Sequence, residues 1–438
     1  MKKLYIICLL LLPVVVQVKA QTLNTRTASS FTVNGLKVIF KPTVKDVISV
    51  RMYFRGGVYN YPGDKAGIES FALKAATQCG TKKYSADAFR DIADKFGIDI
   101  GGSSTYDYGN IGMDCVKQYF DQGWDLFASA VNSPIFTESE VSLLKSKLIT
   151  MASSQQGDPD KHIDDMVMKY AYKGTPYATD PDGDIISLTP ITATDLRDYY
   201  AHILSKNRMF LVIAGNITRA QVEEKVKAFF AALPDIPYIP PVRTSPQWAE
   251  NHLDVEGREL ATNYITGVFN APPINTPEFL AYRMGISGLG GSLFSELRTQ
   301  LNLSYDPGAS AISYLMPYGF MHVSTNSPKE AVEGMVRIIS RVKSLGISDD
   351  GLKYLKSTFI TSNYIKDQGS SAITANLGSA EINGGWEYAE NLPAMLDKVT
   401  VEQINEAMLK YIAGIRWVYL GSPKLAQQAD DAFSTAVH

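Results

Sequence analysis

Two segments of the chain repeat one pattern of apolar and polar positions. Residues 123–148 and 334–359 are related by a constant offset of 211 residues, and their apolar side chains fall at matching places. In each copy the apolar positions recur with helical spacing, stop at a short polar link and then resume, which predicts two amphipathic helices in succession. The links contain Thr137-Glu138 and Ser348-Asp349, a capping residue followed by an acid, where the second helix begins.

A second pair of matching segments follows in each copy. Thr192 and Thr400 begin stretches of similar sequence related by an offset of 208 residues, and both are natural N-caps for the helix that follows. Each helix pattern leads into a short apolar stretch typical of a strand, at 208–214 and at 416–420. Two matches in the same order, with nearly the same offset, indicate an internal duplication.

A proline-rich segment separates the two copies. Five prolines occur within residues 233–252, which excludes a helix or a central strand there and predicts an extended, stiff linker. We therefore expect one domain at 22–233, the linker at 234–252 and a second domain at 253–430. Strands follow one another in groups between long helices, which favours an α+β fold over a doubly wound sheet. The clearest strand patterns are at 37–40, 49–54, 264–269 and 319–324.

The first twenty residues differ from the rest of the chain. Lys2 and Lys3 precede an apolar run at 4–16, and Val18-Lys19-Ala20 ends in small residues that suit signal peptidase. This pattern predicts a signal peptide at 1–20 and an exported, periplasmic protein, with an uncleaved anchor as the alternative. No other segment approaches the length of a membrane-spanning apolar run, so no membrane segment is expected after signal cleavage.

Composition narrows the class of protein. The 438 residues exceed the length of a typical single domain, in agreement with a duplicated chain. The 42 basic and 45 acidic residues leave a net charge of −3, which gives no basic surplus for binding nucleic acid. Outside the predicted signal only Cys79 and Cys115 remain, too few for a disulfide framework. They either pair once or stay buried as small hydrophobic side chains.

The usual catalytic motifs are absent from the sequence. No two of the five histidines lie one helical turn apart, and there is no Gly-x-Ser-x-Gly elbow. Gly288-Leu-Gly290-Gly291-Ser292 lacks the Lys-Ser/Thr ending of a phosphate-binding loop, and we predict a flexible Gly-rich bend there, with a helix starting at Ser292. Arg298 and Tyr305 follow; their donors would suit a peptide carbonyl or carboxylate, and the alternative is a solvated Arg and a packed Tyr.

These features together resemble the insulinase/pitrilysin (inverzincin) peptidase family. The resemblance covers nearly all of the mature chain. It rests on the duplicated halves, on Asn34-Gly-Leu-Lys-Val38, on the segment from Gly67 to Gly80-Thr81, and most specifically on residues 291–305 with their Arg and Tyr. It implies two homologous tandem domains of the mitochondrial-processing-peptidase type, each an antiparallel-rich sheet covered by helices.

The chain departs from this family at the metal site. Active members carry His-x-x-Glu-His on the helix before the Gly-Thr pair. Aligned on that motif, this chain has Ser70, Leu73 and Lys74, and the family's further zinc-binding Glu falls at 150–152, where no acid stands. Glu69 is better explained as an acid favoured at a helix N-terminus. We therefore expect no metal or cofactor on this chain.

Some members of the family divide the labour between two chains, and this sequence resembles the chain without zinc. The resemblance implies a subunit that is inactive alone and pairs with a zinc-motif-bearing partner to cleave unstructured peptides. In that role Arg298 and Tyr305 would act on the substrate carbonyl, and Gly288, Gly290, Gly291 and Ser292 would bind the peptide. The alternatives are a retired peptidase that acts as a structural or peptide-binding protein, and a zinc enzyme with unrecognised ligands.

Overall fold

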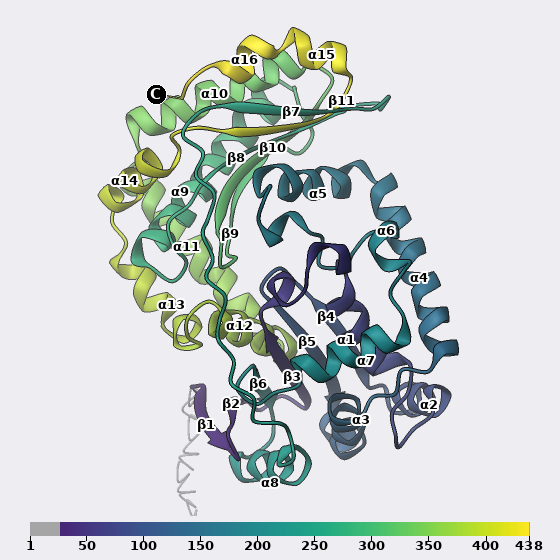
Figure 1. Ribbon diagram of the computed structural model, residues 1–438. Coiled ribbons are helices and arrows are strands. Elements are labelled where there is room, and N and C mark those ends of the chain that lie inside the picture. Colours follow the sequence, from purple (N-terminus) through teal and green to yellow (C-terminus); the bar gives the residue numbers. More distant parts are fainter. Residues whose placement is uncertain (1–26, 438) are drawn as a thin grey trace, which may run out of the picture.

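Two sheets, each with its own layer of helices, make up the part of the chain that the structure describes, residues 27–437 of a computed structural model (Figure 1). The predicted signal peptide at 1–20 lies outside the described residues, as do residues 22–26 of the predicted first domain. The fold is α+β, as expected. None of the helices between residues 27 and 437 has the length and hydropathy needed to span a membrane.

The first sheet has six strands in the order β1-β2-β6-β3-β5-β4. All neighbouring strands are antiparallel except β2 and β6. The strands predicted from apolar patterns at 37–40, 49–54 and 208–214 are all present in it. The strands are β1 (Ser29–Val33), β2 (Leu36–Pro42), β3 (Val47–Arg55), β4 (Asp99–Ser104), β5 (Tyr108–Val116) and β6 (Met209–Gly215).

The second sheet repeats this arrangement with five strands in the order β7-β11-β8-β10-β9. Again only one neighbouring pair is parallel, β7 with β11. Its apolar core continues to Phe433 and Val437, beyond the limit of residue 430 expected for this domain. The strands are β7 (His252–Gly257), β8 (Asn263–Asn270), β9 (Gly308–Ile312), β10 (Tyr318–Thr325) and β11 (Arg416–Gly421).

The helices of the first half include the first copy of the repeated segment, α3 and α4. Thr192 caps α7 through a reciprocal capping box with Asp195, whereas Thr137 precedes α4 without a side-chain capping bond. The helices are α1 (Ile68–Gln78), α2 (Ala86–Phe96), α3 (Phe120–Asn132), α4 (Glu138–Gly157), α5 (Pro159–Ala171), α6 (Ile185–Leu188), α7 (Ala193–Ile203) and α8 (Arg219–Phe230).

The second half contains the other copy of the repeat, α10 and α11. Ser348 caps α11, and Thr400 caps α14 through a capping box with Gln403. The helices are α9 (Pro277–Leu293), the π-helical η5 (Phe294–Gln300), α10 (Pro328–Leu345), α11 (Asp349–Lys366), α12 (Ser370–Ile382), α13 (Glu387–Lys398), α14 (Val401–Tyr411), α15 (Pro423–Gln428) and α16 (Asp430–Ser434).

Each half also lends one helix to the sheet of the other half. Helix α5 packs against β8 and β11 of the second sheet, and α12 packs against β3 and β6 of the first (Figure 1). These two helices begin at Pro159 and Ser370, a separation of 211 residues that equals the offset of the sequence repeat. On α12, Ile373 and Leu377 share a small apolar core with Tyr53 and Phe210. The two halves are therefore joined by an exchange of equivalent helices.

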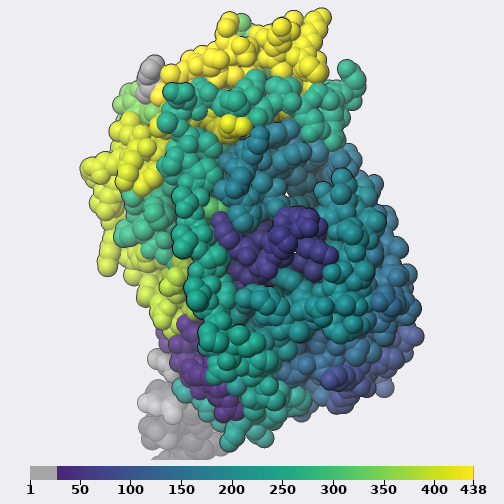
Figure 2. Space-filling view, viewed as in Figure 1, coloured from purple at the N-terminus to yellow at the C-terminus, as the bar shows by residue number. Residues whose placement is uncertain are grey.

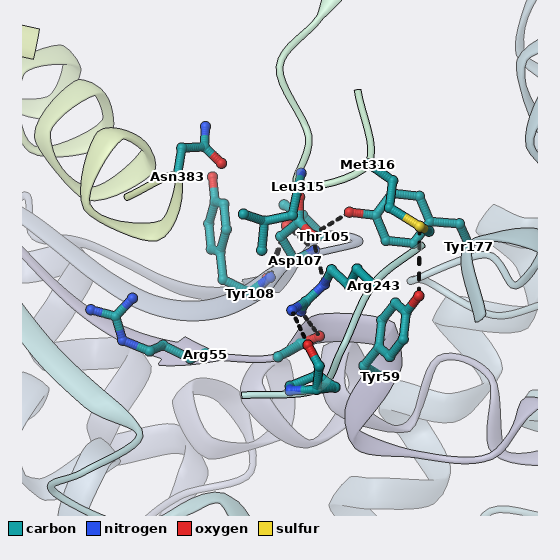
Figure 3. A network of polar contacts seen from close by, with 12 residues as sticks. Arg55, Tyr59, Thr105, Asp107, Tyr108, Tyr177, Arg243, Leu315, Met316 and Asn383 are labelled. Atoms are coloured by element: carbon teal, nitrogen blue, oxygen red, sulfur yellow. Dashed lines mark hydrogen bonds and ion pairs between the residues drawn. The ribbon is translucent and has the colours of Figure 1, made fainter. Parts of the chain in front are cut away.

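The proline-rich segment 233–251 has no helix or strand and runs over the surface between the two halves, in teal in Figures 1 and 2. Its Arg243 turns inward, and its Nε lies 3.7 Å from Oδ1 of the buried Asp107 (Figure 3). Asp107 also accepts hydrogen bonds from the Tyr177 hydroxyl and, at 2.9 Å, from the backbone N–H of Leu315. This carboxylate thus ties together the first half, the linker and the second half.

Candidate functional site

Helix α1 carries the positions that correspond to the metal ligands of active family members. Leu73 is fully buried where α1 crosses β4 and β5. A Cβ built on Gly102 would lie 2.1 Å from the Leu73 carbonyl oxygen, and one on Gly109 would lie 2.4 Å from Leu73 Cδ1. The two glycines therefore let α1 lie directly against the sheet, and Leu73 fills the space between them.

Ser70 and Lys74 share one acceptor, the carboxylate of Asp182. The Lys74 ammonium lies 2.6 Å from Asp182 Oδ1, and the Ser70 hydroxyl donates to the same oxygen. Asp182 belongs to the turn between Asp180 and Gly183, which packs on the start of α1: a Cβ on Gly67 would lie 2.6 Å from the Asp182 carbonyl oxygen. The two positions where the family has histidines are thus both bound to one carboxylate, Lys74 through an ion pair and Ser70 through a hydrogen bond.

These side chains do not fit a zinc ion. Zinc in proteins takes imidazole, thiolate or carboxylate ligands, and Leu73 offers no donor atom, while Lys74 presents a positive charge that is already paired. The exposed Thr150 only hydrogen-bonds to the Ser146 carbonyl of its own helix. Within residues 27–437 no group of three His, Cys, Asp or Glu side chains is arranged to hold a metal ion.

Glu69, next to Ser70, lies in the first turn of α1, as the sequence predicts. Its side chain is also fully buried, which the sequence did not indicate. Its carboxylate accepts hydrogen bonds from Asn60 Nδ2 at 2.7 Å, Ser104 Oγ at 2.9 Å and the Tyr199 hydroxyl at 2.5 Å. Burial raises the pKa of Glu69 to about 7, although these hydrogen bonds oppose the shift. Glu69 is a buried structural anchor.

The predicted Gly-rich bend is wrong, because Gly288–Gly291 lie inside helix α9. A Cβ on Gly290 would lie 2.9 Å from the Ala309 carbonyl oxygen, so this glycine lets α9 approach β9 closely. Gly288, Gly291 and Ser292 face the other way, into a groove of about 560 Å³ between α9 and α11. Three of the four residues predicted to contact a peptide thus line one groove, and Gly290 packs against the sheet.

The structure brings Arg298 and Tyr305 together. Arg298 lies on η5, directly after α9, and its guanidinium carbon is 4.2 Å from the centre of the Tyr305 ring. The Tyr305 side chain is 76% exposed, so it is not packed against a strand. Among the described residues, no carboxylate lies within 4.0 Å of Arg298; the neighbouring Glu296 pairs with Arg337 and Arg341 instead. The Arg298 donors are therefore free to meet a ligand.

The two cysteines of the described chain, Cys79 and Cys115, are both free and buried. Burial raises the pKa of each thiol to about 12, so both remain protonated and unreactive at neutral pH. Of the two alternatives left by the sequence, the structure therefore selects small buried side chains over a disulfide.

A duplicated α+β fold in which α1 holds a Lys–Asp pair at the metal positions defines a peptidase-like protein without the zinc motif. Two family models match the chain: "Insulinase (Peptidase family M16)" over residues 37–180 and "Peptidase M16 inactive domain" over residues 190–359. The chain belongs to this insulinase family of peptidases and to its members without a zinc motif.

The similar proteins include one named as a non-peptidase and one named as a peptidase subunit. The chain is 20% identical over 377 residues to "Non-peptidase homolog YmxG" of Helicobacter pylori, covering 83% of this chain and 84% of that protein. It is 21% identical over 303 residues to the mitochondrial-processing peptidase subunit beta of Saccharomyces cerevisiae, covering 64% and 66%. Together with the inactive-domain match, the first similarity supports a pseudopeptidase.

Solved structures share the fold. A peptidase M16 inactive domain from Pseudomonas fluorescens superposes with a TM-score of 0.81 at 20% identity, covering 90% of this chain and 98% of that one. A protease from Helicobacter pylori gives a TM-score of 0.83 at 18% identity, covering 90% and 99%. The periplasmic protease PqqL from Escherichia coli gives 0.74 at 16% identity, covering 92% of this chain and 48% of PqqL. The similarities extend over at least 90% of this chain, so both halves share the fold of these solved structures.

Proposed function

We propose that this chain is the exported, zinc-free subunit of a two-chain insulinase-like metallopeptidase. The observation that carries the proposal is the Arg298–Tyr305 pair: an unpaired guanidinium stacked on an exposed tyrosine, in a chain whose own metal positions are occupied by an ion pair. The partner would carry the zinc motif and the catalytic carboxylate. Export is proposed from the charged and apolar pattern of residues 1–20.

The pair suits a peptide carbonyl that gains negative charge. The Tyr305 ring contacts the face of the Arg298 guanidinium, so the N–H groups at its edge stay available, and the Tyr305 hydroxyl adds another donor. Donors held in place before the reaction stabilise an oxyanion without reorganisation. The groove lined by Gly288, Gly291 and Ser292, six to ten residues before Arg298 in the chain, would hold the extended peptide.

The test of this function is reconstitution with a zinc-motif-bearing partner of the same family. Peptide hydrolysis should require both chains, and Arg298→Ala should lower kcat of the mixed complex by roughly 10²-fold while assembly stays intact, because one oxyanion donor is lost. The matched control is Arg219→Ala, which removes an exposed arginine on α8. Chelator-sensitive hydrolysis by this chain alone, or an unchanged rate for Arg298→Ala, would refute the proposal.

A second candidate function is a structural or peptide-binding protein without a hydrolytic role. The match to the model "Peptidase M16 inactive domain" favours it, as does the Lys74–Asp182 pair at the former metal positions. The same reconstitution separates the two functions. If the mixed complex assembles but gains no hydrolytic activity, and the chain still binds unstructured peptides, the second function is correct.

A further inference from the structure

The second half contains a polar cavity of about 420 Å³ that belongs neither to the α1 site nor to the Arg298–Tyr305 pair. Its walls come from α9, α11, α12 and α13. Helix α12 also packs against the first sheet. Amide and hydroxyl side chains make up much of the lining. Among them are Ser287, Asn363, Asn376, Ser379 and Asn383.

The charges that line this cavity are all positive. Arg283 and Lys366 are the only ionisable Lys, Arg, Asp or Glu residues in the wall. The acids on neighbouring turns point away toward the first half: Glu381 lies 2.8 Å from Lys37, while Asp367 and Glu390 both pair with Lys41. Within the described residues, no carboxylate lies within 4.0 Å of either Arg283 or Lys366.

Arg283 is half-buried in the wall of this cavity and has no carboxylate as a counter-charge. Its guanidinium carbon lies 5.3 Å from the centre of the Phe359 ring, which supports one face. Burial lowers the pKa of Arg283, the expected response of a cation that has lost water. The Tyr388 hydroxyl lies beside Arg283 and opposes this lowering of the pKa, while Asn275 Nδ2, buried in the same wall, has no hydrogen-bond partner. A largely desolvated cation without a carboxylate partner and an unused amide donor normally require an acceptor, since leaving them unpaired is costly.

We propose that this cavity binds the free carboxylate at the C-terminal end of a peptide. The planar fork of Arg283 matches a carboxylate in bidentate geometry, and Lys366 at the mouth adds a second positive charge. The asparagine amides can both donate to and accept from the peptide groups that precede the carboxylate, and a free phosphate ion has no such peptide groups. Ile274 and Leu392 supply an apolar wall for the terminal side chain.

The experiment uses the full mature chain and a pair of short peptides. Acetyl-trialanine with a free carboxylate and the same peptide with a C-terminal amide are titrated by calorimetry. The free acid should bind at least about tenfold more tightly, because a charge-assisted pair is lost in the amide. Sodium acetate and inorganic phosphate are titrated in parallel to distinguish a peptide end from a free anion.

Variants locate the site. Arg283→Gln should remove the preference for the free acid, and Lys366→Gln, at the exposed mouth, should reduce it without a risk to folding. Lys353→Gln, on the outer face of α11, is the matched control and should leave the preference unchanged. Equal affinity for acid and amide, or absence of binding by either at millimolar concentration, would overturn the proposal. So would phosphate binding as tightly as the peptide, or a preference that survives in both Arg283→Gln and Lys366→Gln.

Discussion

Lys74 occupies a position where active family members have a zinc-binding histidine, and its ammonium group places a positive charge there. Its ammonium and the Asp182 carboxylate form a contact of 2.6 Å, and Ser70 completes it. The Asp182 side chain is 55% exposed, so water screens the pair and its contribution to stability is small. The pair therefore satisfies the polar groups at the former metal positions, and the packing of Leu73 against the sheet holds α1 in place.

Leu73 offers a direct test of that packing. Leu73→Glu, which restores the glutamate of the family motif, should destabilise the fold by roughly 3 kcal/mol or more, because it buries a carboxylate without a partner. Leu73→Met keeps the volume and should cost less than about 1.5 kcal/mol. Urea denaturation of the two variants measures the difference. Equal stabilities would show that the site is open enough to solvate an acid.

Glu69 predicts how stability depends on pH. Its pKa is raised from 4.5 to about 7 in the folded state, so the folded protein holds this proton more tightly than the unfolded chain. The free energy of unfolding should therefore fall as pH rises from about 4.5 to about 7, by roughly 3 kcal/mol for this group, and then level off. Glu69→Gln should be flatter over that range when the two proteins are compared by denaturation at pH 5 and pH 8. An identical slope in the variant would contradict this assignment.

At the scale of single residues, the sequence predicted that the zinc ligands are absent, but it did not predict the contacts that replace them. The metal positions Ser70, Leu73 and Lys74 follow from the family motif because their spacing is local. Their partner Asp182 lies 108 residues beyond Lys74, so no local pattern brings the two together. Likewise nothing local to Glu69 indicates that Tyr199 will reach it.

At the scale of the element, apolar periodicity predicted β2, β3, β6, β8, β10 and β11 and the repeated helix pairs, since both depend on neighbours in sequence, but it did not predict the other five strands of the described chain. It failed at Gly288–Gly291, where glycine content alone suggested a bend. The segment is helical because Leu289 and Leu293 continue the buried face of α9, and because Gly290 meets the backbone of β9. Tertiary packing overrode the low helix propensity of glycine there.

The two adjacent glycines of α9 make a matched pair of variants. Gly290→Ala should destabilise the fold by about 1–3 kcal/mol, because its Cβ would collide with the Ala309 backbone. Gly291→Ala should be neutral or stabilising by up to about 1 kcal/mol, since nothing lies within 4 Å of its Cβ and alanine favours the helix. Thermal melts of both variants test this. A flexible loop would instead give similar effects at the two positions.

At the scale of the whole molecule, the duplication was visible in the sequence but the helix exchange was not. The offset of 211 residues identifies α5 and α12 as equivalent, yet no local pattern tells which sheet each will cover. Ion pairs reinforce the exchange: Glu381 at the end of α12 lies 2.6 Å from Arg55 on β3. We therefore expect the two halves to unfold as one cooperative unit.

Cutting the linker tests that cooperativity. A protease site introduced between Ile239 and Val242, whose side chains are 86% and 90% exposed, allows cleavage of the folded protein. The two fragments should still elute together in size-exclusion chromatography and unfold in a single transition, because α5 and α12 remain in place. Fragments that separate without denaturant would show that the linker, rather than the exchanged helices, holds the halves together.

The exchange of helices also sets an order of events during synthesis. A chain that emerges from its N-terminus has completed β6 long before α12 is made, so the surface around Tyr53 and Phe210 stays uncovered in the meantime. A nascent polypeptide that ends before residue 370 presents that apolar sheet face to water and to other unfinished chains. Completion of the first domain therefore waits for the second, and premature termination anywhere in between yields an aggregation-prone product.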